Sequence, residues 1–403
     1  MSSSIQLLRN RFIQAVLISN LFAQIGIWVR NFAVLLFVME MTSGDALSVT
    51  MISVAEYAPI FIFSFVGGVF ADRWRPKRTI VWCECLSSLS VLIVFLVLAT
   101  GSWEAVFFAT LCSSILSQFA QPSGMKLFKK HVRDEDASTR MSLLQTLLSV
   151  FIIIGPLLGT LVYQQLGIEL AILLTGVSFL LSALAMLAVP ADDDDLPNQA
   201  HERSSLLREM TDGIRYVLSS KELLFLSLCF ILVGLGVGLI SPLSIFIITE
   251  QLRLPAHDLQ WITIPYGSGE IIGGILTFVL AAKIAPHRLL IIGLLVDGAG
   301  IILTGLSAQL WITMAAQFLI ALQQPAIFIG NNALVLQHTS QEYIGRVTGI
   351  RTPLMTGAML LTMSLAGVLK TALSLTVVYE LAGLCFLAGL LMLLPLRKGL
   401  KPI

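Results

Sequence analysis

The stretch GGVFADRWRPKRTIV, residues 67–81, joins two long apolar segments through a short basic loop. One acid, Asp72, lies among four bases, which are Arg73, Arg75, Lys77 and Arg78. A basic joint between two apolar segments is typical of membrane-spanning helices that meet at the cytoplasmic surface. The stretch therefore predicts that the chain is a membrane protein and that the basic residues form the loop between two of its helices.

The composition of the whole chain favours the same class of protein. Of its 403 residues, 56% are hydrophobic and 12% are charged, whereas soluble domains carry about 25% charged residues. The first apolar run, at about residues 12–38, is longer than a signal-peptide core of roughly 7–15 residues. We therefore expect an integral membrane protein and no nucleic-acid partner.

The apolar segments are long enough and numerous enough to predict an all-α fold with twelve transmembrane helices. A span needs about 20 apolar residues to cross about 30 Å of hydrocarbon. In the first half the expected spans are 12–38, 48–71, 79–99, 104–126, 141–164 and 169–189. In the second half they are 222–248, 259–282, 287–306, 310–334, 347–370 and 374–395.

The basic residues predict the orientation of these spans. Most of the 25 lysines and arginines fall at the two ends of the chain and in the even-numbered loops. Cytoplasmic loops are enriched in such residues. Both termini are therefore expected in the cytoplasm.

The two halves of the chain repeat one another at a spacing of nearly constant length. Pro76 and Arg78 recur as Pro286 and Arg288, and Gln121-Pro122 recurs as Gln324-Pro325. The acidic run ADDDD, at 191–195, and an amphipathic segment at 206–218 separate the halves. The expected domains are a bundle at 1–190, a cytoplasmic linker with an amphipathic helix at 191–221, and a bundle at 222–403.

Neither a metal nor a cofactor is expected. The acidic run lacks the glycine and the spaced ligands of a calcium loop, and no nucleotide-binding loop is present in the sequence. All five cysteines lie in apolar runs, where packing is a better interpretation than metal binding. Direct coupling to ATP hydrolysis is therefore not expected.

The loop at 67–81 resembles the signature loop between helices two and three of the major facilitator superfamily, written G-x-x-x-D-R-x-G-R-K. The matching positions are Gly68, Asp72, Arg73 and Lys77. The second glycine of that pattern is Arg75 here, and the next basic position is Pro76. The resemblance implies two six-helix bundles, a cavity between them and transport by alternating access.

The same resemblance implies a conformational latch. In that family the aspartate of the loop docks near the amino end of helix eleven and stabilises the outward-open state, and an acid is favoured at such an end. The expected latch residues are Gly68, Asp72, Arg73, Lys77, Arg78 and Arg351. A purely topological role of the loop, or contact of its bases with anionic membrane lipids, remains an alternative.

Two further resemblances indicate which branch of this superfamily the chain is similar to. Gly155, Pro156 and Gly159 look like the core of the antiporter motif of drug exporters, and they predict a bend or a close helix approach. A simple kinked packing helix is the alternative. The stretches at 20–47 and 341–349 look like the macrolide-efflux and enterobactin-exporter-like branch of drug:proton antiporters.

Ionisable residues inside spans are candidates for function because they are costly in a membrane. Arg30 and Glu56 are expected at similar depth on neighbouring helices, either as a structural ion pair or as a pair that lines the cavity. Glu270 lies among small residues near the expected midplane, where it could bind protons or a cation. Asn31, Gln121 and Gln324 are expected to add polar points to the cavity.

The sequence therefore predicts a proton-coupled exporter (an antiporter) of amphipathic small molecules such as drugs or macrolides. We expect a monomer in the inner or plasma membrane, and no enzyme. Three alternatives keep the fold: a siderophore exporter, a lysophospholipid or other lipid exporter, and an uncoupled facilitator. A non-transporting membrane receptor is a fourth, and it should carry a soluble output domain.

Overall fold

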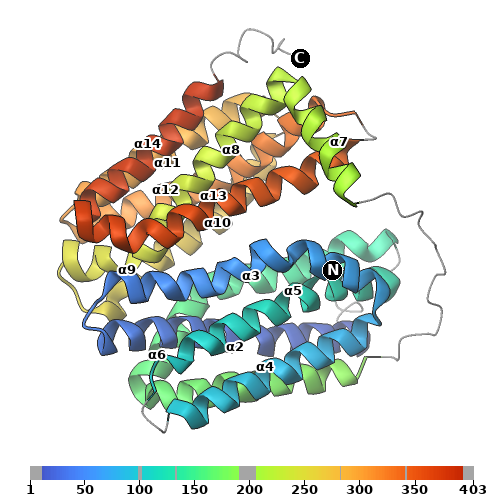
Figure 1. Cartoon of the computed structure of the whole chain (residues 1–403), viewed down its shortest axis with the longest axis vertical. Coiled ribbons are helices and arrows are strands. Elements are labelled where there is room, and N and C mark those ends of the chain that lie inside the picture. The colour runs from blue at the N-terminus through green and yellow to red at the C-terminus, as the bar shows by residue number, and fades with distance from the viewer. Residues whose placement is uncertain are drawn as a thin grey trace. The chain divides into compact units, whose positions relative to one another are not determined.

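The computed structural model describes residues 11–98, 102–131, 134–189, 206–281, 283–340 and 343–393. Every element in these ranges is helical, and they contain no strand. The chain divides into two compact units, Met1–Asn198 and Gln199–Ile403. Figure 1 shows the helices of both units, and each unit is described by itself below.

The first unit contains five long helical elements. They are α2 (Arg11–Met41), α3 (Ala46–Arg73), α4 (Pro76–Leu98), α5 (Ala105–His131) and α6 (Asp134–Leu187). Helix α2 packs against α6, α3 packs against α5, and α4 packs against both α5 and α6. Their buried apolar side chains, such as Val34, Val91, Val106 and Ile172, form the core of this unit.

Helix α6 covers two of the expected spans, because Gly167 interrupts it with a φ of 74° and a ψ of −179°. Only glycine adopts this conformation without strain, since it has no Cβ. Before Gly167, the residue numbers of the contacting pairs rise along both α6 and α2, so the two helices are parallel. Gly155 lies against Trp28, and Gly159 lies against Phe32.

After Gly167, the contacts of α6 with α2 run in the opposite direction. Phe179 lies against Gly26, and the hydroxyl of Ser182 is 3.0 Å from that of Ser19. The residue number therefore rises along α6 while it falls along α2. Gly167 is the point at which the chain turns back, and α6 consists of two antiparallel arms.

The second unit begins with a short helix and continues with longer ones. The elements are α7 (Leu206–Ser219), α8 (Lys221–Ile240), η1 (Ser241–Leu243), α9 (Ser244–Phe246), η2 (Ile247–Gln251), η3 (Ala256–Leu259), α10 (Gln260–Ala281), α11 (Pro286–Leu306), α12 (Leu310–Gln337), α13 (Ile344–Leu373) and α14 (Leu375–Leu393).

The helix pairings of the second unit repeat those of the first. Helix α8 packs against α13 and α14, as α2 packs against the two arms of α6. Helix α12 packs against α10 and α11, as α5 packs against α3 and α4. Pro76 and Pro286 both occupy the first position of a helix, where a missing N–H is harmless. These pairings support the internal repeat predicted from the sequence.

The span expected at 222–248 is not one regular helix. Helix α8 ends at Ile240, a 3-10 turn contains Pro242, and a π-helix covers Ile247–Gln251. A proline inside a helix removes a backbone donor and crowds the preceding turn. Pro242 thus accounts for the interruption, which an apolar run as uniform as this one hides.

Helix α7 is tied to the second unit. Tyr216 stacks on Tyr343 with the ring centroids 4.3 Å apart, and its hydroxyl oxygen accepts a 3.1 Å hydrogen bond from the backbone N–H of Ser340. Gly213 lies against Ile350 of α13. This helix covers the amphipathic part of the expected linker, whereas residues 190–205 lie outside the described ranges.

Within the described ranges, nine helices are long and apolar enough to cross a membrane. They are found in α2, α3, α4, α6, α8 with its continuation, and α11 to α14. Helix α5 supplies a shorter apolar segment, Ala105–Gln121. The chain is thus a multi-pass membrane protein, and the number of twelve spans stays a prediction.

Candidate functional site

A buried cluster of polar side chains joins three helices of the first unit. Arg30 of α2 is 3% exposed, and its Nε and Nη2 donate to Oδ1 of Asn31 at 3.1 and 2.8 Å. Its Nη1 donates to Oγ of Ser113 on α5. A buried guanidinium needs such partners because it has lost its water.

Asn31 connects this arginine to Glu56 of α3. The Nδ2 of Asn31 donates a 2.8 Å hydrogen bond to Oε1 of Glu56. The direct ion pair that the sequence suggested between Arg30 and Glu56 does not form among the described side chains. The reason is that an asparagine amide carries an acceptor and a donor, so it can stand between a cation and an anion.

The antiporter-like motif lies beside this cluster, where α6 closely approaches α2. A methyl group at Gly155 would overlap the ring of Trp28. One at Gly159 would lie 2.6 Å from Cβ of Phe32 and 2.7 Å from the carbonyl oxygen of Trp28. Pro156 is buried inside α6 between these two glycines. Gly155 and Gly159 therefore lie where α6 closely approaches α2 within the first unit, and the role of the motif stays a prediction.

A second buried arginine lies in the second unit. Arg351 of α13 is 6% exposed, and its Nε donates to Oγ of Ser227 at 3.1 Å. Its Nη2 donates to the carbonyl oxygen of Leu226 at 3.1 Å and to Oδ1 of Asn331 at 3.0 Å. The guanidinium carbon lies 5.4 Å from the centre of the Phe230 ring.

Glu270 of α10 is half-buried. Neighbouring Gly269 and Gly273 lie so close to α12 that added methyl groups would overlap its backbone carbonyls. Gly274, one turn after Glu270 on the same side of the helix, has open space within 4 Å of an added methyl group. No hydrogen bond or ion pair joins Glu270 to any residue that the structure describes.

The remaining predicted cavity residues do not join these clusters. Gln121 is exposed on α5 and Gln324 is half-buried on α12. Neither makes a side-chain hydrogen bond within the described part of the chain. Their roles stay predictions.

The expected latch residues are only partly described. Gly68, Asp72 and Arg73 belong to α3, but the side chains of Asp72 and Arg73 lie outside the described part of the chain. The Nζ of Lys77 donates to the carbonyl oxygens of Leu187, at 3.0 Å, and Val189, at the end of α6. A cation is favoured at this end of a helix. Arg78 is exposed.

The structure adds two serines that the sequence did not single out. Ser113 and Ser227 hold the two buried arginines, yet serines are common in helices that pack closely, so they gave no signal. Asp297 of α11 is fully buried, and both of its carboxyl oxygens lack hydrogen-bond partners among the described residues. No group of three potential metal ligands occurs in the described ranges.

The whole chain was compared with protein-family models. The model described as Major Facilitator Superfamily matches residues 16–236 and 226–402. The MFS-type transporter YkuC of Bacillus subtilis is 28% identical over 373 residues, which are 90% of this chain and 86% of that protein.

Two efflux proteins are similar at lower identity. The multidrug efflux pump Tap of Mycobacterium tuberculosis is 22% identical over 367 residues, which are 87% of this chain and 84% of Tap. Macrolide efflux protein A of Streptococcus pyogenes is 22% identical over 343 residues, 82% of both chains.

Solved structures show the same fold. A mutant of the nucleoside transporter NupG superimposes with a TM-score of 0.77 at 13% identity. The alignment covers 97% of this chain and 100% of NupG. At this identity the similarity concerns the fold alone.

Proposed function

Because this chain belongs to the Major Facilitator Superfamily, and the relatives described above are transporters and not enzymes, we propose that it is a proton-coupled exporter. Its cargo would be amphipathic small molecules such as drugs or macrolides, moved by alternating access. The efflux activity named for two relatives supports outward transport and this kind of cargo.

Glu270 carries the proposal of proton coupling. Its carboxyl group is half-buried, is free of partners among the described residues and lies on the side of α10 where Gly274 leaves open space. A carboxyl group held by hydrogen bonds or ion pairs would resist protonation, whereas a desolvated one without partners accepts a proton readily. Glu270 is therefore the first candidate for the proton-carrying residue.

Glu56 is the second candidate. Asn31 donates to Oε1 only, and Oε2 has no hydrogen-bond partner in the described part of the chain. Protonation of Glu56 would remove its negative charge and leave Arg30 without a nearby anion. Such a change alters the balance of buried charge in the first unit, as a coupling step requires.

The topology completes the proposal. The repeated pairings of the two units support twelve spans in two bundles, at 1–190 and 222–403, with a cytoplasmic linker at 191–221. We place the protein as a monomer in the inner or plasma membrane, with both termini in the cytoplasm. The proposed latch consists of Gly68, Asp72, Arg73, Lys77, Arg78 and Arg351.

The decisive experiment uses the purified full chain in proteoliposomes with a pH-sensitive dye inside. An imposed proton gradient is followed while a panel of amphipathic cations, macrolides, siderophores and lysophospholipids is added. We expect at least one compound to discharge the gradient, and Glu270→Gln to abolish that discharge. Glu104→Gln is the matched control, because Glu104 is exposed outside the helices.

Three results would contradict the proposal in different ways. If Glu270→Gln and Glu56→Gln both retain full proton-dependent transport, the coupling residues are wrong. If a compound equilibrates across the membrane without moving protons, the protein is a facilitator or a lipid carrier. If no compound crosses, a receptor is the better interpretation.

A further inference from the structure

The buried cation Arg351 has no ion-pair partner among the residues that the structure describes. Its hydrogen-bond partners are a hydroxyl, a backbone carbonyl and an amide oxygen, all of them neutral. No ion pair joins it to an acidic side chain within the described ranges. A buried charge without an opposite charge is costly, and such charges in proteins are normally paired.

Asn331, beside that arginine, has a donor that meets no acceptor in the described part of the chain. Its Oδ1 accepts from Nη2 of Arg351, which fixes the orientation of the amide. Its Nδ2 is therefore not the atom that contacts Nη2 of Arg351; it is buried and has no hydrogen-bond partner among the described residues. Asn331 is 0% exposed, and a fully buried polar group without a partner is rare enough to require an explanation.

The first unit contains the same arrangement with its acceptor present. Asn31 accepts from Arg30 through Oδ1 and donates through Nδ2 to the carboxylate of Glu56. In the second unit Asn331 accepts from Arg351 in the same way, but no carboxylate of the described residues receives its Nδ2. The comparison indicates which chemical group the second cluster lacks.

We propose that Arg351 and Asn331 form a binding site for the carboxylate group of a small amphipathic molecule. A carboxylate has two oxygens in one plane, so it can accept from Nδ2 of Asn331 and from Nη1 of Arg351, which makes no hydrogen bond within the described part of the chain. Its single negative charge balances one guanidinium, and charge-assisted hydrogen bonds of this kind are short and strong.

The surroundings of the site fit a ligand with an apolar body. The ring of Phe230 lies against the guanidinium, and Phe328 contacts that ring edge-on, with the centroids 5.6 Å apart. Arginine and aromatic rings together suit an aromatic acid, because Phe328 is 42% exposed and its ring can contact the apolar part. The ligand class is therefore an aromatic or otherwise amphipathic carboxylic acid.

The depth of the site indicates the side of the membrane from which a ligand would enter. Ser227 and Arg351 lie in the second and third turns of α8 and α13, which begin at Lys221 and Ile344, or about 10 Å from those helix ends. Under the proposed topology these ends are cytoplasmic, and the site would take its ligand from the cytoplasm. Only this direction depends on the proposed function.

The test compares acids with their uncharged amides on the purified full chain in detergent. The probes are benzoate and 2-naphthoate, with benzamide and 2-naphthamide as neutral counterparts, and the readout is the midpoint of thermal unfolding, Tm. We expect the acids to raise Tm and the amides not to. Arg351→Gln should weaken acid binding about tenfold or more, as loss of a charge-assisted bond does.

A second variant keeps the test decisive if Arg351→Gln fails to fold. Asn331→Asp places a carboxylate of the chain beside Arg351, so it should raise Tm without ligand and abolish the shift that the acids cause. Asn332→Asp is the matched control, because Asn332 is exposed on the same helix, and it should leave the acid-induced shift unchanged.

Specific outcomes would overturn the inference. One is that acids and amides shift Tm equally, and another is that Asn331→Asp lowers Tm and keeps the acid response. If acids stabilise only an Asp72→Asn variant, the chain supplies the carboxylate and no small molecule is needed. Because binding is measured without a gradient, acid binding without proton-coupled transport refutes the proposed function alone. Transport without acid discrimination refutes this site alone.

Discussion

Asn31 donates a 2.8 Å hydrogen bond to Glu56, and the same amide accepts two hydrogen bonds from Arg30. The cation and the anion are therefore coupled through a neutral residue. A direct ion pair would have to break for either charge to act alone, whereas here Glu56 can be protonated while Arg30 keeps its contact with Asn31. The amide also joins α2 to α3 at this depth.

Replacement of Asn31 should therefore destabilise the first unit. Asn31→Leu removes a partner from both Arg30 and Glu56 in a buried site, and each unsatisfied group costs about 1–3 kcal/mol. We expect a clear loss of Tm in detergent. Asn20→Leu is the control, because Asn20 donates only to the Val16 carbonyl of its own helix. An equal loss in both variants would argue against the bridging role.

Two adjacent glycines of α10 should respond differently to the same small change. Gly273→Ala forces a methyl group onto the backbone carbonyl of Leu322, whereas Gly274→Ala meets nothing within 4 Å. Overpacking of this kind costs about 1–3 kcal/mol. Thermal unfolding of the two variants should show a loss for Gly273→Ala only. A tolerated Gly273→Ala would mean that α10 and α12 are not in close contact.

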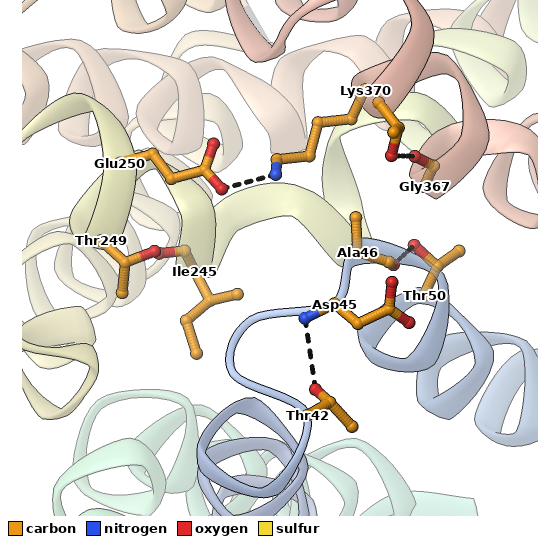
Figure 2. A network of polar contacts seen from close by, with 10 residues as sticks. Thr42, Asp45, Ala46, Thr50, Ile245, Thr249, Glu250, Gly367 and Lys370 are labelled. Atoms are coloured by element: carbon orange, nitrogen blue, oxygen red, sulfur yellow. Dashed lines mark hydrogen bonds and ion pairs between the residues drawn. The ribbon is translucent and has the colours of Figure 1, made fainter.

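The ion pair between Lys370 and Glu250 should contribute little to stability. Figure 2 shows the two side chains facing one another, with Nζ of Lys370 2.5 Å from Oε1 of Glu250. The glutamate side chain is 48% exposed, and pairs of this kind contribute at most about 1 kcal/mol. Glu250→Gln should thus lower the free energy of unfolding only slightly, and less so at high salt.

The lysine itself has a second contact that the glutamate variant leaves intact. Nζ of Lys370 lies 4.0 Å from the centre of the Phe246 ring. Lys370→Met should therefore cost more than Glu250→Gln, by the cation–π contribution of about 0.5–1 kcal/mol. Unfolding measurements on both variants compare these contributions. Equal losses would show that the ring contact contributes nothing.

Loss of the Tyr216 hydroxyl should loosen α7. The change Tyr216→Phe removes two hydrogen bonds to Ser340, at 3.1 and 3.3 Å, and keeps the stacking on Tyr343. Partly exposed hydrogen bonds contribute about 0.5–1.5 kcal/mol each, so local opening of α7 should become several-fold more frequent. Limited trypsin cleavage after the exposed Arg215 measures that opening. Tyr343→Phe is the control and should cleave at the wild-type rate.

Much of the fold could be predicted because glycine, proline and charge mark the ends of membrane helices. The expected joint after residue 71 lies close to the observed one, where α3 ends at Arg73 and α4 begins at Pro76. The interruption of α8 near Pro242 was missed. Hydropathy averages over many residues, and one proline in an apolar run leaves that average almost unchanged.

The sites were less predictable because they depend on helix rotation. Equal depth brought Arg30 and Glu56 together as candidates, but depth alone could not show that Asn31 would lie between them. Arg351 was expected to act through its position near a helix start. Its contact with Asn331 depends on which sides of α12 and α13 face one another, and one sequence does not contain that information.

The turn at Gly167 limits how this protein can be labelled. Since one residue reverses the chain there, an inserted peptide epitope would have to unwind the ends of both arms of α6 before an antibody could reach it. The turn between α2 and α3 differs, because Thr42 and Asp45 form an exposed cap with several residues outside the helices (Figure 2). An epitope tag placed at Ser43 would therefore report which side of the membrane this turn occupies while leaving both helices intact.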